Sequence, residues 1–270
     1  MCNDHIEVDR RERHYVMTKP PKTTSRRAGG RGPRRTAKQN GALVLSREAI
    51  VGCALDLTER EGAGALTLRR LGLELGVDAT AFYRHFRDKD ELVLACMDRI
   101  IEMSYANVAD RVANADWRTV ISEVAWESWR MCEAHPAIYS IAFARTTGGP
   151  GERQMVELLV GALSSIGLDR SRTVEMYRLF VDSLLALCGM RATMLGLPSD
   201  VREKDATAWS RIYAVLPEVS YPATRAHADE LASITDQSIF GALVETITNT
   251  IAAKAADPKP QESDLTGAVE

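Results

Sequence analysis

The sequence predicts an all-α fold. Apolar side chains recur at spacings of three and four along most of the 270 residues, which is the period of an amphipathic helix. Many of these segments begin at Ser, Thr or Asp and end at Gly or before Pro, as helices do. No segment shows strand-like alternation, and no unit of 20–50 residues repeats. We therefore expect an N-terminal three-helix domain with a helix-turn-helix, followed by a helical bundle.

The first expected helix begins after Ser46, whose hydroxyl group is a good N-cap, and ends at Gly62. Leu45 precedes the cap and can pack against Ile50, which fixes the direction in which the chain enters the helix. This pattern predicts a well-anchored first helix.

Three more helix starts follow at Thr67, Asp78 and Asp88. The helix that starts at Thr67 is short and ends at Gly76, and the helix after Asp78 is short as well. Two short helices joined by a Gly-containing turn and flanked by longer helices form a helix-turn-helix. We place this motif at residues 67–86.

The chain divides into four expected parts. Residues 1–40 form a disordered basic arm, residues 41–100 the helix-turn-helix domain, residues 101–256 the helical bundle, and residues 257–270 a loose tail. The bundle helices that we expect are residues 116–134, 137–145, 151–166, 170–196, 202–216 and 236–254.

Charge is distributed unevenly between these parts. Residues 1–40 contain eleven Lys and Arg against four Asp and Glu, although the whole chain has a net charge of −3. A basic arm on an acidic body indicates a polyanionic partner at one end only. A solvated tail without a partner is the alternative.

The helix between Asp78 and Phe86 has one face suited to DNA. At 100° per residue, Phe82 and Phe86 fall on the buried side, while Thr80 and Arg84 lie almost opposite, with Ala81 and Tyr83 on the flanks. Arg can bond bidentately to guanine, and Thr can contact a thymine methyl group. The donors that can bind flanking phosphates are Tyr83, His85, Arg87 and Lys89. Alternatively, Tyr83 and His85 fill space between helices.

The stretch LTLRRLGLELGVDATAFYRHFRDKDEL (residues 66–92) resembles the DNA-binding domain of the TetR family of bacterial regulators. The resemblance covers about residues 44–95, and its order and spacing are highly specific. Matching positions are Thr67, Arg69, Leu75, Gly76, Val77, Phe82, Tyr83, His85, Phe86, Lys89 and Leu92. Two positions depart from the family pattern. Gly72 replaces the usual Ala, which weakens its helix by up to ~1 kcal/mol, and Asp78 replaces the usual Ser cap.

The resemblance implies a transcriptional regulator that reads a palindromic operator in double-stranded DNA as a homodimer, most simply as a repressor released by a small-molecule effector. It implies that Thr67, Tyr83, His85 and Lys89 position phosphates, and that Thr80, Ala81 and Arg84 face bases. Arg69 belongs to the same predicted DNA-binding set. An activator is the alternative to a repressor.

The expected helix at residues 170–196 is apolar nearly all round from Leu179 onwards and must be covered on every side. The last helix offers a complementary apolar stripe of Phe240, Leu243, Val244, Ile247 and Ile251. We therefore expect residues 170–196 and 236–254 to pair with their copies in a second subunit, an arrangement that the resemblance supports. A fully intramolecular bundle is the alternative. The stretch YPATRAHADEL (residues 221–231) resembles, more weakly, the tetracycline-repressor branch of the family.

An effector pocket is expected in the bundle. Its apolar walls are predicted to include Trp126, Trp129, Tyr139, Phe143, Met176, Tyr177 and Phe180. Polar contacts are predicted from His135, Arg130, Arg145 and Asp182. Plain core packing is the alternative for each of these residues.

Other classes of function have little support in the sequence. The five cysteines are scattered, as in a reduced cytoplasmic protein, and no metal-ligand set, cofactor motif or catalytic signature occurs. We expect no membrane partner, because no apolar run is long enough to span a bilayer. A redox-responsive regulator using Cys53 or Cys96 remains an alternative, although both occupy apolar helical positions.

Overall fold

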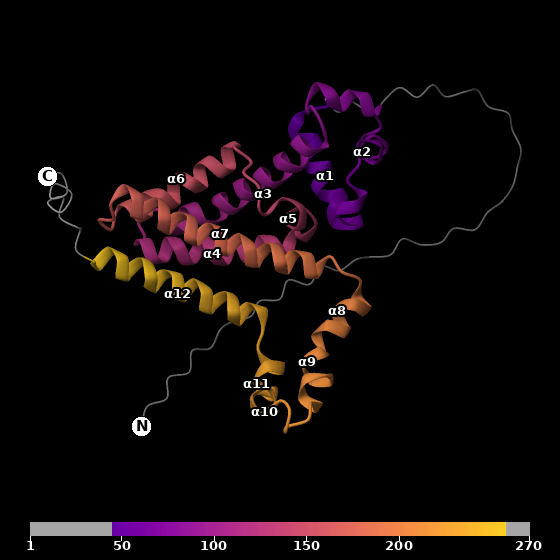
Figure 1. Ribbon diagram of the computed structural model, residues 1–270. Coiled ribbons are helices and arrows are strands. Elements are labelled where there is room, and N and C mark those ends of the chain that lie inside the picture. The colour runs from indigo at the N-terminus through magenta and orange to yellow at the C-terminus, as the bar shows by residue number, and fades with distance from the viewer. Residues whose placement is uncertain (1–44, 258–270) are drawn as a thin grey trace, which may run out of the picture. The chain divides into compact units, whose positions relative to one another are not determined.

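The computed structural model describes residues 45–257, and all regular structure in this range is helical (Figure 1). The N-terminal elements are α1 (Arg47–Glu61), η1 (Ala63–Ala65), α2 (Leu68–Leu75), η2 (Ala79–Arg84) and α3 (Lys89–Val112). The bundle elements are α4 (Trp117–Ala134), α5 (Pro136–Ala142), α6 (Pro150–Ser164), α7 (Arg170–Leu195), α8 (Ser199–Ala206), α9 (Ala208–Arg211), η3 (Tyr213–Val215), α10 (Pro222–Ala226), α11 (Ala228–Ser233) and α12 (Asp236–Ala256). The predicted fold class is confirmed.

Three details differ from the prediction. The helix expected at residues 202–216 is wrong, since α8, α9 and η3 share this region and none exceeds eight residues. Helix α3 continues past residue 100, where we expected the first domain to end. The basic arm expected at residues 1–40 lies outside the described residues, as does the tail from residue 258.

The helix starts predicted from the sequence are confirmed by their hydrogen bonds. Ser46 Oγ accepts from Ala49 N at 3.1 Å, and Thr67 Oγ1 accepts from Arg70 N at 3.1 Å. Asp88 Oδ1 accepts from Glu91 N at 2.8 Å. Each bond satisfies a backbone donor that has no partner inside its helix.

The turn of the helix-turn-helix depends on close backbone approach. Gly76 ends α2 with φ of +66°, in the left-handed region that favours glycine. At Gly72, a Cβ atom would lie 2.8 Å from the carbonyl oxygen of Val77. Glycine at this position therefore weakens α2 as an isolated helix but relieves crowding between α2 and the turn.

Helix α12 lies along α4 and α7 of its own chain (Figure 1). Phe240 is fully buried, with its ring centroid 4.6 Å from that of Trp129 and 5.2 Å from that of Trp126. Val244, Ile247 and Ile251 are also buried within the chain. Most of the apolar stripe that we expected to face a second subunit is therefore buried within its own chain. The need to cover this stripe was thus the wrong reason to expect dimerisation.

Helix α7 is covered on one side by α4, α5, α6 and α12. Three apolar residues of α7 remain exposed, namely Val174, Leu179 and Met190. No single helix in residues 45–257 is long and apolar enough to cross a membrane, while the bent pair α7–α8 meets the criteria of length and composition.

Helices α3 and α6 meet at unusually short range. Asp98, which is buried in the middle of α3, accepts hydrogen bonds from Glu152 N at 2.9 Å and from Gly151 N at 3.2 Å. The N-cap residue of α6, Gly149, has no side chain to make such bonds. Asp98 therefore caps α6 from another helix, where its negative charge also favours the positive end of the helix dipole.

Candidate functional site

The helix predicted between Asp78 and Phe86 is a 3-10 helix, η2, in the structure, but its side chains are exposed or buried as predicted. Phe82 and Phe86 are buried beneath it. Thr80 and Arg84 are exposed, and Tyr83 is 60% exposed, so Tyr83 does not fill space between helices. Ala81 is half-buried beside them. This face is small at one end and carries a long cation at the other, as the reading of base edges in a major groove requires.

Further predicted DNA-binding residues surround this face. Thr67 and Arg69 lie exposed at the start of α2, and Lys89 lies exposed at the first position of α3. His85 is half-buried directly after η2. The oxygen of Thr67 is used in capping α2, but its hydroxyl proton can still be donated to a phosphate.

An ionic cluster that the sequence patterns did not reveal holds the end of η2. Arg47 donates to the carbonyl oxygen of His85 at 2.7 Å and to Glu91 Oε1 at 2.9 Å, with its guanidinium carbon 4.2 Å from the centre of the Phe86 ring. Glu91 Oε2 accepts from Arg87 N at 2.9 Å. This backbone hydrogen bond, together with the bond from Arg47, lowers the pKa of Glu91 from 4.5 to about 2. The cluster joins α1, η2 and α3 at the candidate surface.

A cavity of about 760 Å³ lies between α6, α7 and the segment after α5. It is lined by Phe143, Ala144, Arg145, Thr146, Gly148, Glu152, Arg153, Val156, Glu157, Tyr177, Arg178, Val181, Asp182, Leu185 and Ala186. Burial raises the pKa of the Tyr177 phenol. Apolar side chains with several charged groups around them suit a ligand that is partly apolar and partly polar.

The predicted pocket residues lie in several places. Phe143 and Tyr177 line this cavity, as do Arg145 and Asp182. Tyr139 and Phe180 are buried in the core, and Trp126 and Trp129 pack against α12. Met176 is buried in the core. Arg130 forms an ion pair with Glu127 at 2.5 Å, and His135 Nδ1 lies 2.7 Å from Glu59 Oε1 of α1.

The segment at residues 143–149 connects the cavity to α3. Arg145, which lines the cavity, forms a bidentate ion pair with Asp90 in the first turn of α3, with Nη2 2.8 Å from Oδ2. Thr147 donates to Asp98 Oδ1 at 2.8 Å. One short segment therefore contacts both the cavity and the helix that follows the candidate DNA-binding surface.

The structure gives little support to a redox mechanism at the two cysteines considered above. Cys96 is fully buried, and burial raises the pKa of its thiol to about 12. Burial also raises the pKa of the Cys53 thiol. Both groups are therefore protonated near neutral pH, and the thiol is much less reactive than the thiolate.

Comparisons with known proteins decide the family. Residues 50–96 match the family described as bacterial regulatory proteins, tetR family. An HTH-type transcriptional regulator of Mycobacterium tuberculosis is 31% identical over 153 residues, which are 53% of this chain and 69% of that protein. The chain belongs to the TetR family. The transcriptional repressor DrrR1 of Streptomyces coeruleorubidus is 28% identical over 52% of this chain, and the chain spans about half of that repressor, 49% of its length.

Solved structures agree with this assignment. A TetR regulator of Streptomyces coelicolor superposes with a TM-score of 0.63 and 26% identity, over 78% of this TetR-family chain and 99% of that one. ActR of Streptomyces coelicolor, solved in complex with actinorhodin, superposes with a TM-score of 0.66 and 23% identity, over 79% of this chain and 99% of ActR. The ActR likeness concerns the fold.

Proposed function

We propose that this TetR-family regulator binds a palindromic operator as a homodimer and represses transcription until a small-molecule effector releases it. The observation that carries the proposal is the surface of η2, where Thr80 and Arg84 are exposed while Phe82 and Phe86 are buried. A dimer with two such faces reads half-sites one helical turn apart, or roughly 34–36 Å.

The surrounding residues support a division of work at this surface. Thr80, Ala81 and Arg84 face the bases, while Thr67, Arg69, Tyr83, His85 and Lys89 bind phosphates. Phosphate contacts fix the register of the protein on the duplex, whereas base contacts determine which sequence it prefers. The Arg47–Glu91 cluster holds the end of η2 and so fixes the orientation of Arg84.

The cavity between α6 and α7 is the effector site in this proposal. Its volume of about 760 Å³ fits a drug-sized molecule. A ligand that displaces residues 143–149 changes the position of Arg145 and Thr147, and both side chains hold α3. The effector then favours a conformation in which the two η2 faces no longer match their grooves.

The test compares Arg84→Ala with Lys89→Ala on an operator found by footprinting the DNA around the coding region. Arg84→Ala is expected to cost about 1–3 kcal/mol on the operator and to relax the preference at one position in each half-site. Lys89→Ala is expected to weaken binding to operator and random duplex alike, because a phosphate contact carries no sequence information. Titration of each variant against both duplexes measures the difference.

The two variants control for each other, because both remove one positive charge from the same surface. An equal loss by Arg84→Ala on operator and random duplex would show that Arg84 does not read bases. Equal affinity of the unaltered protein for both duplexes would contradict operator recognition altogether.

A further inference from the structure

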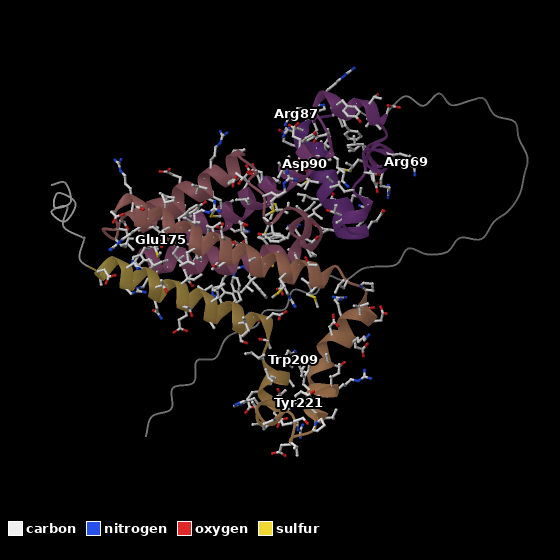
Figure 2. The ribbon with its side chains drawn as sticks, viewed as in Figure 1. Arg69, Arg87, Asp90, Glu175, Trp209 and Tyr221 are labelled. Carbon is white, nitrogen blue, oxygen red and sulfur yellow. The ribbon has the colours of Figure 1, made fainter. Side chains whose placement is uncertain are left out.

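The hydroxyl group of Thr80 is held by the residue that caps η2. Thr80 is the second residue of η2 and is exposed, and Asp78 is the N-cap. Asp78 Oδ1 accepts a hydrogen bond from Thr80 N at 2.8 Å and lies 2.7 Å from Thr80 Oγ1. Figure 2 shows Arg69 and Arg87 on the domain that carries this pair. One carboxylate oxygen therefore contacts both the backbone and the side chain of Thr80.

The charge of Asp78 fixes the direction of the second hydrogen bond. The bonds from the side chain and the backbone of Thr80 hold the pKa of the Asp78 carboxyl below its usual value of 3.8. At neutral pH this group is therefore a carboxylate, which can only accept hydrogen bonds. Thr80 must then donate its single hydroxyl proton to Asp78. Its oxygen keeps its lone pairs, and no group in residues 45–257 donates to them.

Thr67, the cap of α2, has the opposite arrangement. Its Oγ1 accepts from Arg70 N at 3.1 Å, so its hydroxyl proton remains available. A hydroxyl group that can donate suits a phosphate, because phosphate oxygens accept. Thr80 presents only an acceptor and so cannot donate a hydrogen bond to a phosphate. The two threonines on this surface therefore suit different parts of DNA.

Few groups of DNA can donate to the oxygen of Thr80. In the major groove the donors are the exocyclic amines, N6 of adenine and N4 of cytosine, whereas O6 of guanine and O4 of thymine accept. Against O6 or O4, two acceptors would face each other without a proton between them. Leaving a desolvated acceptor without a donor costs more than a missing contact. An acceptor at Thr80 therefore favours a base that carries an exocyclic amine.

We propose that Asp78 makes Thr80 a hydrogen-bond acceptor towards the bases, so that Thr80 selects adenine or cytosine over guanine or thymine on the strand that it contacts. The inference rests on the proposed binding of operator DNA by η2, and it assigns a chemical preference to one position in each half-site. Asp78 is a positioning residue, which contacts Thr80 and acts on the DNA through it.

The test measures the affinity of each protein for operator duplexes in which every position of both half-sites is changed to each other base. At one position the unaltered protein is expected to favour adenine or cytosine by about three- to tenfold, as one net hydrogen bond does. Thr80→Val keeps the shape of the side chain but removes the oxygen, so this ratio should fall towards one. Thr80→Ser restores the hydroxyl group and should restore the preference.

Base analogues identify the group that Thr80 reads. Replacing the adenine at this position by 2-aminopurine removes N6 from the major groove and leaves the paired thymine unchanged. The affinity is expected to fall severalfold, although O4 of that thymine is still present. Replacing the thymine by uracil removes only its methyl group and is expected to leave the affinity unchanged.

Asp78→Ser tests the positioning role. Serine is also a good N-cap, but its own hydroxyl proton can be donated to Thr80, which frees the proton of Thr80. The preference is expected to narrow at this position alone, while the loss of a negative charge strengthens binding to all duplexes alike. The matched control is Asp116→Ser, because Asp116 caps α4 and accepts from Thr119 Oγ1 at 2.9 Å. This control should leave every base preference unchanged, and circular dichroism checks that both variants stay folded.

Each contrary outcome overturns one statement. Equal affinity for all bases at every position would contradict operator recognition together with this proposal. A preference at other positions, with none that responds to Thr80→Val, would refute base reading by Thr80 and leave operator recognition standing. Sensitivity to uracil but not to 2-aminopurine would show that Thr80 contacts the thymine methyl group instead.

The two serine variants decide the part of Asp78. A preference that survives Asp78→Ser unchanged would refute the positioning role. A change of preference in Asp116→Ser as well would attribute the effect to the stability of the fold and not to the orientation of the Thr80 hydroxyl group.

Discussion

Glu91 illustrates how one side chain supports a binding surface without belonging to it. Its carboxylate accepts hydrogen bonds from Arg47 of α1 and from the backbone of Arg87 after η2. The sequence predicted a helix start at Asp88, and Glu91 lies in the first turn of that helix. The participation of Arg47 was not predictable, because 44 residues separate it from Glu91 and only the folded chain brings them together.

Glu91→Gln is expected to lower the free energy of unfolding by about 1 kcal/mol at pH 7, a modest figure because Arg47 and Arg87 are largely exposed. The pKa of Glu91 is depressed in the folded state, so its stabilising contribution is present above about pH 4.5 and is lost as the pH falls towards 2. The difference between the two proteins should therefore narrow from pH 4.5 downwards. Urea unfolding at several pH values measures it, and a constant difference would contradict the role of the charge.

At the scale of elements, helix starts were the most predictable feature. An N-cap is a local interaction within four residues, so the helix starts at Ser46, Thr67 and Asp88 could be predicted from the sequence. The α8–α11 region was not predictable in the same way. Its helices contain at most eight residues, which is too short for a helical period to stand out in the sequence.

The contact between α3 and α6 was not predicted, because the Gly-Gly-Pro-Gly stretch at residues 148–151 indicates only a break between helices when it is taken from the sequence alone. A Cβ at Gly151 would lie 2.5 Å from the carbonyl oxygen of Asp98 and 2.7 Å from Glu102 N. A Cβ at Gly149 would overlap the Asp98 carboxylate. These glycines are required by an approach between helices that are some fifty residues apart in the sequence.

Gly151→Ala is expected to destabilise the protein by about 1–3 kcal/mol, because the new methyl group forces α6 away from the α3 backbone. The matched control is Gly161→Ala on the same helix, where a Cβ meets nothing within 4 Å. That control should stabilise the protein by up to ~1 kcal/mol, since alanine favours helix over glycine. Urea unfolding measures both, and equal effects would mean that the α3–α6 contact is not tight.

At the scale of the whole molecule, the order of the long helices and the exposure of Thr80 and Arg84 followed from the sequence, whereas the lining of the cavity did not. Of the seven residues proposed first for the effector site, Phe143 and Tyr177 line the cavity. Tyr139, Phe180 and Trp129 are equally aromatic but face the core. Periodicity places a residue on one face of a helix, but it does not distinguish a filled interface from a hollow one.

The cavity can be tested before its effector is identified. Amphipathic aromatic compounds are screened for those that raise the melting temperature and also displace operator DNA. At a concentration 100 times Kd, a ligand adds about 2.7 kcal/mol, which corresponds to roughly 5–10 °C in a chain of this size. Val181→Trp, whose side chain fills the cavity from α7, should abolish both the rise in melting temperature and the displacement of operator DNA. Gln154→Trp, exposed on α6 and outside the cavity lining, should preserve them. Equal responses of the two variants would place the effector site elsewhere.

In the proposed release of DNA, the hydrogen bonds between Asp98 and the start of α6 make Asp98 the point about which α3 can tilt. Asp98 lies nine positions after Lys89 in α3, a length of about 13 Å along the helix. A tilt of about 10° around Asp98 displaces Lys89 by about 2 Å, and η2 is joined to that end of α3 by four residues. In a two-fold dimer the displacements of the two subunits can add, which changes the separation of the two recognition faces by up to about 4 Å. Half-sites in the proposed complex lie roughly 34–36 Å apart, the repeat of the major groove. A change of this size therefore removes both recognition faces from their matching positions at once.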